Sequence, residues 1–242
     1  EIMSAFAEAS NRVLFVENTG VRSAQFRDWS RLLHRVQNWL KSTKGFREVR
    51  ERLFVYSPII LPFPYSRIAR WINRRLLVKP LQRWMRATGF RRPLVWTFLP
   101  TPLMRELIRD LNPELTVYYC IDDLASSSSA ARRIVRSEEQ VFREADVVFV
   151  TSEKLRQRAV RFNARVHYFP FGVDFEQFAR VRDSAHALPE ELRRMPGSIV
   201  GYVGGVHQWV DQDLLCYAAA RMPATSFVLV GLGPRWDTQT YY

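Results

Sequence analysis

The sequence contains few cysteines and no recognisable set of metal ligands. Only two of its 242 residues are cysteine, Cys120 and Cys216. Two isolated cysteines form no disulfide framework, so we expect both thiols to be reduced and buried, as in a cytosolic protein. The four histidines are scattered and do not show the Cys/His spacing of a zinc site. We therefore expect neither a metal nor another cofactor.

Long hydrophobic runs are also absent. No stretch of 18 apolar residues occurs, so no transmembrane helix is predicted. The first ten residues, EIMSAFAEAS, carry two acids and no basic segment, which is not the pattern of a secretory signal. Neither a Gly-x-Ser-x-Gly elbow nor a Walker phosphate loop is present. With 47% hydrophobic residues, the composition is that of a globular protein of one or two domains.

Acidic residues are missing from one long segment. Residues 52–105 contain eleven Lys or Arg and no Asp or Glu, and they supply nearly all of the formal net charge of +12. In the helix predicted from Ser66, basic and apolar residues fall on different faces, and tryptophan lies between them. Such a helix suits an anionic membrane surface, and the expected docking residues are Arg67, Arg70, Trp71, Arg74 and Arg75. The alternatives are a solvated arginine face and nucleic-acid binding; no nucleic-acid motif is visible, so a nucleic-acid partner is not expected.

Apolar runs alternate with helical patterns through the middle of the chain. LTVYYC, VVFV and VHYF read as strands, and amphipathic segments separate them. Polar or special-geometry residues follow each run: Asp122 and Asp123, then Thr151 and Ser152, then Gly172 and Asp174. In an open parallel α/β sheet, ligands bind outside the carboxyl ends of the strands. All three positions are therefore predicted to lie on the edge of the sheet where ligands bind.

The same criteria give the other elements. Helices are predicted over about 2–9, 25–41, 66–79 with a break allowed at Pro80, 101–111, 129–144, a short segment after Ser152, and 211–220. Strands are predicted over about 12–18, 51–62, 93–100, 116–121, 146–150, 165–169, 198–203 and 226–231. The polar stretch 179–197, which contains Pro189 and Pro196, is typical of an interdomain linker.

Three motifs give the chain a resemblance to the retaining glycosyltransferases of family 4. They are Asp122-Asp123 after a strand, the segment from Ala145 to Ser152, and the segment from Pro170 to Phe178. With GYVGGV and VLVGLGP, the resemblance covers roughly residues 93–234. It implies an α/β protein of the GT-B type, with a Rossmann-like parallel-sheet N-terminal domain and the beginning of a second Rossmann-like domain. The implied limits are 1–176 for the acceptor-side domain, 177–196 for the linker and 197–242 for the nucleotide-sugar-binding domain.

The resemblance also implies a reaction. A hexosyltransferase of this kind moves a sugar from a nucleoside-diphosphate sugar, such as a UDP- or GDP-sugar, to an acceptor hydroxyl with retention. The acceptor would be a glycan, a lipid-linked compound or an envelope polysaccharide, and the enzyme would be cytoplasmic or peripheral on the inner face of a membrane. No metal or other cofactor is implied.

Residue roles follow from the matching positions. Asp122 takes the place of a family histidine and Asp123 that of the aspartate. Both are therefore candidate catalytic residues that orient a sugar hydroxyl or accept its proton. The alternative is that they cap the next helix.

The acceptor is expected near Asn18, Thr19, Gly20 and Arg22. The expected donor site, in which glycines let the backbone approach a diphosphate, consists of Gly204, Gly205, His207, Trp209, Gly231 and Gly233. The family's Arg and Lys are missing from VHQWVDQD, and a tight turn is the alternative there. Gly172 and Asp174 are expected to form a turn that shapes the interdomain cleft.

The sequence also leads us to expect a fragment cut at both ends, inactive alone. A βαβ unit would place a strand before the first helix, and two strands with one helix do not cover both faces of a parallel sheet. Two other functions remain open: a nucleotide-sugar epimerase of the same fold, and a non-catalytic membrane-associated module.

Overall fold

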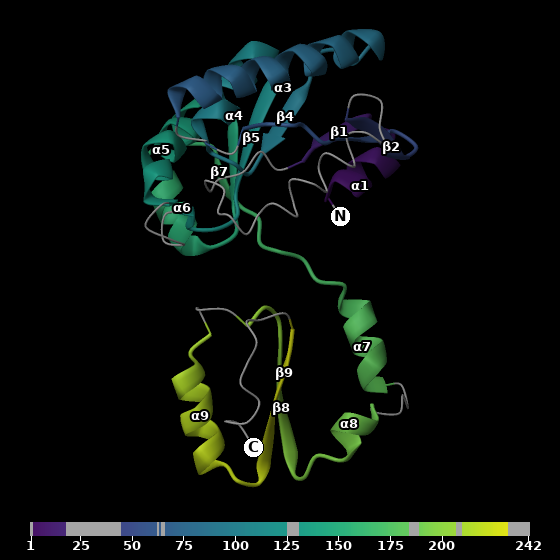
Figure 1. The fold of residues 1–242 in the computed structure, drawn as a ribbon, viewed down its shortest axis with the longest axis vertical. Helices are drawn as coiled ribbons and strands as arrows, with labels where there is room; N and C mark the ends of the chain where they lie inside the picture. The colour runs from purple at the N-terminus through teal and green to yellow at the C-terminus, as the bar shows by residue number, and fades with distance from the viewer. Residues whose placement is uncertain are drawn as a thin grey trace. The chain divides into compact units, whose positions relative to one another are not determined.

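The computed structural model describes residues 2–17, 45–61, 63, 66–124, 131–183, 189–206 and 210–231. The chain divides into two compact units, Glu1–Gly172 and Val173–Tyr242, and each is treated by itself (Figure 1). The predicted helix at 25–41 lies outside the described residues.

The first unit begins with the smaller of its two hydrogen-bonded sheets, of order β1-β3-β2. Helix α1 (Ile2–Glu8) precedes β1 (Val13–Val16), and β2 (Phe46–Arg50) and β3 (Leu53–Tyr56) follow. β1 pairs parallel with β3, as the sequence predicts, but β2 and β3 form an antiparallel hairpin, which the sequence analysis missed. Arg52 turns the hairpin with φ of 65°.

The second sheet of this unit has the order β4-β5-β6-β7, and all of its described pairs are parallel. It is built from β4 (Leu94–Thr97), α4 (Pro102–Leu111), β5 (Leu115–Cys120), α5 (Val135–Glu144), β6 (Val147–Val150), α6 (Glu153–Ala159) and β7 (Val166–Tyr168). A 3₁₀ turn, η3 (Ala131–Ile134), leads into α5, so the regular helix begins later than the predicted residue 129. One core lies between this sheet and the helices α5 and α6, with Tyr118, Phe142 and Val148 fully buried.

Helix α3 (Arg67–Ala87) runs without interruption through Pro80, so the break allowed there does not occur. Ser66 caps the helix by accepting a hydrogen bond from the Ala69 amide. Proline has no N–H to donate to the carbonyl four residues earlier. The Tyr56 hydroxyl donates to that Leu76 carbonyl at 3.4 Å instead. β3 therefore supplies a donor to the carbonyl that Pro80 leaves without its helical partner.

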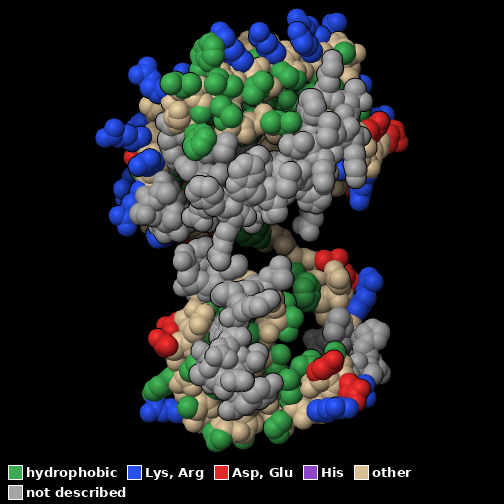
Figure 2. All heavy atoms as spheres, viewed as in Figure 1, with side chains coloured by type: hydrophobic (Ala, Val, Ile, Leu, Met, Phe, Trp, Pro, Cys, Tyr) green, Lys and Arg blue, Asp and Glu red, His purple; other side chains and the backbone are tan. Residues whose placement is uncertain are grey.

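Two of the predicted docking arginines have another role. Arg70 forms an ion pair with Glu106 of α4 at 2.9 Å, and Arg74 forms a two-bonded pair with Asp110 of the same helix. These contacts join α3 to α4, which lie side by side (Figure 1). Arg67, Trp71 and Arg75 remain on the exposed side, where Figure 2 shows Lys and Arg side chains along the outer edge of the unit.

The second unit contains α7 (Phe175–Asp183), α8 (Glu190–Arg193), β8 (Ser198–Val203), α9 (Gln212–Arg221) and β9 (Thr225–Val230). β8 and β9 pair in parallel through six registered residue pairs. The stretch expected as a linker contains α7 and α8. Cys120 is buried as predicted, but Cys216 on α9 is exposed, which corrects the prediction that both thiols are buried.

Within the described residues, none of the helices is both long and apolar enough to cross a membrane.

Candidate functional site

The candidate site is the carboxyl edge of the β4–β7 sheet. β5 lies between β4 and β6, and its residues from Thr116 to Cys120 are buried. The chain leaves the sheet at Ile121, and the next two residues are the predicted catalytic pair. The Asp122 side chain is exposed, whereas Asp123 is 29% exposed. The two neighbouring carboxylates therefore occupy different environments.

Asp123 is held by helix α6. Its carboxylate lies 3.3 Å from the Arg158 guanidinium and 3.8 Å from the Lys154 ammonium. Arg158 also binds Glu138 of α5, so one guanidinium joins the loop after β5 to a second helix. Asp123 thus positions this loop, and Asp122 is the member of the pair that is open to a ligand.

Glu138 is the buried centre of this network. The Glu138 side chain is fully buried, and the Tyr118 hydroxyl donates to it at 2.9 Å. Burial raises the pKa of Glu138, while Arg158 and the Tyr118 hydroxyl act in the opposite direction. Burial also raises the pKa of Tyr118 well above its ordinary value, which keeps the hydroxyl protonated and donating.

Cys120 ends β5 within the same cluster, with its Sγ atom 3.9 Å from Glu138 Oε1. Burial, with the Glu138 charge beside it, raises the pKa of Cys120 to about 12. The nucleophile in cysteine chemistry is the thiolate. Cys120 is therefore a packing residue.

Sequence reasoning missed Glu138 and Arg158. A signal for Glu138 was present, because it lies four residues after Ile134 and four before Phe142, so all three share one face of the helix. A carboxylate at a buried position needs a charged or hydrogen-bonding partner. The sequence alone does not identify that partner as Arg158.

The next loop along this edge is tied to the first. The Thr151 hydroxyl, directly after β6, donates to the Ile121 carbonyl at 2.5 Å. Ser152 caps α6 by accepting from the Leu155 amide at 3.3 Å. Both residues lie at the predicted edge, and their observed contacts fix the geometry of the loop that carries Asp122.

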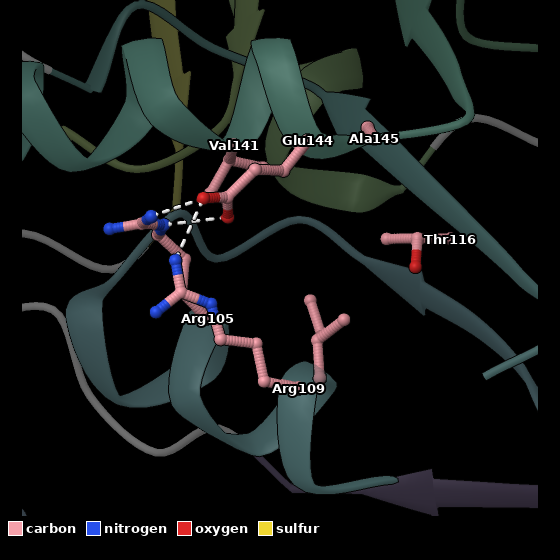
Figure 3. A pocket seen from close by; sticks show the side chains of 7 residues that line it. Arg105, Arg109, Thr116, Val141, Glu144 and Ala145 are labelled. Atoms are coloured by element: carbon pink, nitrogen blue, oxygen red, sulfur yellow. Dashed lines mark hydrogen bonds and ion pairs between the residues drawn. The ribbon is translucent and has the colours of Figure 1, made fainter. Parts of the chain in front are cut away.

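A pocket of about 280 Å³ lies elsewhere, between α4 and α5 (Figure 3). Thr116, near the start of β5, lines it, so this pocket is on the amino side of the sheet and away from Asp122. Arg105 and Arg109 both point to the Glu144 carboxylate and bind it (Figure 3). Arg105, followed by Arg109, lowers the pKa of Glu144. These ion pairs join two helices and leave no free charge for a substrate on Glu144.

In the second unit, the structure brings two predicted donor-site glycines together. Gly204 follows β8 and Gly231 follows β9, and the Gly204 amide donates to the Val230 carbonyl at 2.9 Å. A Cβ atom on Gly231 would lie 1.7 Å from the Gly204 carbonyl oxygen. Gly205 is the acceptor for the Tyr202 hydroxyl at 3.1 Å. The close approach of these backbones requires glycine at position 231.

We expect Gly231→Ala to destabilise the second unit by about 1–3 kcal/mol, the usual cost of overpacking. The methyl group would force the Gly204 and Gly231 backbones apart. Faster hydrogen exchange of the β8 and β9 amides would report this change. Gly201→Ala is the matched control, because a Cβ atom at that position would meet nothing within 4 Å. Equal exchange rates in the two variants would contradict the close-contact role.

The beginning of α9 is already capped. Asp211 accepts a hydrogen bond from the Leu214 amide at 2.9 Å, and Asp213 lies in the first turn. Residues 204–213 contain no Lys or Arg. A diphosphate at the start of this helix would meet two carboxylates and, among the described residues 204–206 and 210–213, no Lys or Arg.

The other predicted site residues are distributed as follows. Asp174 accepts from the Gln177 amide at 3.0 Å and caps α7. Gly172 does not have positive φ, so glycine's conformational freedom is not used there. Their role in shaping a cleft stays a prediction. The remaining predicted residues lie outside the described part of the chain: Asn18, Thr19, Gly20, Arg22, His207, Trp209 and Gly233.

Among the residues that the structure describes, no group of three His, Cys, Asp or Glu side chains is placed to hold a metal ion.

Comparisons with known proteins place the fold. No protein-family model and no curated protein matches the sequence. Among solved structures, the chain is similar to the sucrose-phosphate synthase of Thermosynechococcus elongatus, with a TM-score of 0.58 and 17% sequence identity. The match covers 91% of this chain, which spans 62% of the length of that protein. The chain therefore has an α/β, glycosyltransferase-like fold of the GT-B type, as the sequence predicts.

Proposed function

We propose that this protein is a glycosyltransferase that moves a hexosyl group from a nucleoside-diphosphate sugar to an acceptor hydroxyl with retention. The observation that carries the proposal is the exposed Asp122 carboxylate, which follows the central strand β5 of a parallel sheet in a glycosyltransferase-like fold. Ligands of open α/β sheets bind at this edge. The close contact between the Gly204 and Gly231 backbones supports a donor-phosphate site at the carboxyl edge of strands β8 and β9 in the second unit.

Asp122 would bind the acceptor in this mechanism. A carboxylate at an exposed edge can orient a sugar hydroxyl or accept its proton as the hydroxyl attacks the anomeric carbon. The bond from that carbon to the diphosphate breaks, and the pair of electrons leaves with the diphosphate. The Gly204 amide is already bonded to the Val230 carbonyl, so the backbone amides that follow Gly204 and Gly231 would stabilise the departing charge. Neither a metal nor another cofactor is part of this proposal.

The acceptor proposed is a glycan or a lipid-linked compound, and the enzyme is proposed to work at the cytoplasmic face of a membrane. UDP- and GDP-sugars are the donors to test first, with release of nucleoside diphosphate measured in the presence and absence of candidate acceptors. Release that requires the acceptor supports transfer, and the anomeric configuration of the product, read by NMR, tests retention. Conversion of the donor sugar without an acceptor would instead indicate an epimerase.

Asp122→Asn is expected to lower the transfer rate of the full-length protein by roughly 10²- to 10⁴-fold, the contribution of a positioned proton acceptor. The substitution keeps the shape of the side chain and removes its charge. Glu114→Gln is the control, because Glu114 is an exposed carboxylate at the opposite end of the same strand. A transfer rate that Asp122→Asn leaves unchanged would remove Asp122 from the mechanism.

A further inference from the structure

The outward face of α3 combines exposed apolar side chains with unpaired cations. Ile68 is 74% exposed, Trp71 54% and Leu76 46%, although the helix buries Ala69 and Leu77 against the unit. Figure 2 shows hydrophobic and basic side chains together along this edge. Single exposed apolar residues are ordinary, but a cluster of large ones within three turns of a helix indicates a surface that contacts something apolar.

The chain before α3 is bonded to the buried side of the helix. Asn73 is buried in α3, and its side chain binds both the amide and the carbonyl of Leu61, at 2.7 and 2.8 Å. The Ser66 amide donates to the Phe63 carbonyl at 3.2 Å. These bonds hold Leu61 and Phe63 beside the start of α3, although both side chains are exposed.

The cations of this face are not neutralised. Within the described residues, no ion pair is made by the exposed α3 residues Arg67, Arg75, Lys79, Arg83 and Arg86. Arg75, Lys79 and Arg83 follow one another at intervals of four residues, so they share one side of the helix. The cations of helix α6, in contrast, are paired. There Lys154, Arg156 and Arg158 each face a carboxylate.

A shallow pocket of about 290 Å³ opens on the same surface, between α3 and α4. It is lined by Trp71, Arg74, Arg75, Val78, Lys79 and Asp110. The Asp110 carboxylate is paired with Arg74. The Arg75 guanidinium lies 3.7 Å from the centre of the Trp71 ring. Arg75 and Lys79 can therefore donate hydrogen bonds to an anion beside the Trp71 ring. This combination suits a phosphate group attached to an apolar chain.

We propose that this face of α3 is the docking surface of the protein for an anionic phospholipid bilayer, with a lipid phosphate in the Trp71–Lys79 pocket. Unpaired cations attract the negative leaflet, while Ile68 and Trp71 enter the interface between headgroups and acyl chains. A nucleic acid would use the cations but leave Ile68 in water. Arg70 and Arg74 of the predicted docking residues pair with α4, so the cations of α3 without an ion pair among the described residues are Arg67, Arg75, Lys79, Arg83 and Arg86. The inference goes beyond sugar transfer and is tested without it.

The test is sedimentation of the protein with phosphatidylcholine vesicles that contain or lack phosphatidylserine. We expect binding only when phosphatidylserine is present. Arg75→Gln with Lys79→Gln should lower the partition coefficient by roughly tenfold or more, since each cation near the leaflet contributes severalfold. Arg161→Gln with Arg165→Gln removes the same charge from exposed positions after α6 and should leave binding unchanged. Circular dichroism checks that each variant is folded.

A second variant separates insertion from charge alone. Ile68→Ser with Trp71→Ser keeps every cation and should still weaken binding to vesicles that contain phosphatidylserine. Equal and negligible binding to both vesicle types would overturn the proposal, as would an equal loss in the Arg161/Arg165 control. Tighter binding of duplex DNA than of these vesicles, weakened by the Arg75/Lys79 variant and unaffected by the Ile68/Trp71 variant, would also overturn it.

Discussion

Replacing Arg158 by Met is expected to lower the free energy of unfolding by about 3–5 kcal/mol at neutral pH, the usual result of removing one partner of a buried ion pair. Glu138 is fully buried, and Arg158 is the cation that binds it. Methionine fills much of the same space but leaves the carboxylate without a counter-charge. Chemical denaturation followed by circular dichroism measures the loss. Arg156→Met on the same helix should have no measurable effect, because Arg156 pairs with Glu153 at the surface.

The loss should depend on pH in a defined direction. Burial raises the folded-state pKa of Glu138 above the ordinary value of 4.5. A group with a raised pKa contributes stability that is fully present below its unfolded-state pKa and is lost as pH rises through the folded-state pKa. Without Arg158 the pKa rises further. The deficit of the variant should therefore be small in acid, where Glu138 is protonated, and should grow as pH rises from about 4.5.

The double variant Arg158→Met with Glu138→Gln completes the cycle. A neutral glutamine can still accept the hydrogen bond from Tyr118, so the double variant should recover most of the stability lost in Arg158→Met. It should also lose the pH dependence. A deficit that stays the same at all pH values, or that Glu138→Gln does not reduce, would show that Arg158 acts through Asp123 or through packing and not through Glu138.

The β4–β7 sheet could be predicted from the sequence because its signals are local. Each strand is a short apolar run, each helix has its own periodicity, and caps such as Thr101 and Ser152 mark the helix starts. The position of Asp122 at the carboxyl edge follows directly from that order. Its exposure, and the different environment of Asp123, do not, because they depend on the position of Arg158.

Other features could not be predicted because their causes are distant in the chain. The antiparallel strand β2 reads FREVR and is exposed over most of its length, so it lacks the apolar pattern of a buried strand. The donor to the carbonyl that Pro80 leaves without its helical partner is Tyr56, which is far from it in sequence. The ion pairs of Arg70 and Arg74 depend on Glu106 and Asp110, which only the packing of α4 brings near.

The core behind the candidate site leads to the second large effect: Phe142→Ala should lower the free energy of unfolding by about 3–5 kcal/mol. Phe142 on α5 is fully buried. Its ring centre lies 5.2 Å from that of Tyr118 and 6.0 Å from that of Phe162. Alanine would remove the contacts of an entire ring and leave a cavity between the sheet and its helices. Phe171→Ala is the control, since Phe171 is 67% exposed in the same unit.

Hydrogen exchange measures the loss of stability in Phe142→Ala and also shows where in the first unit it occurs. Phe142 packs against Tyr118, whose hydroxyl binds Glu138, so the cavity lies beside the network that holds Asp123. Exchange should therefore accelerate first at the amides of β5, β6 and β7 and less at those of β1 and β3, which belong to a separate sheet with its own core around Tyr56 and Leu77. Equal acceleration in both sheets would mean that they unfold as one cooperative unit. The entire first unit would then lose stability together. A loss of stability no larger than that of Phe171→Ala would mean that the neighbouring side chains fill the cavity.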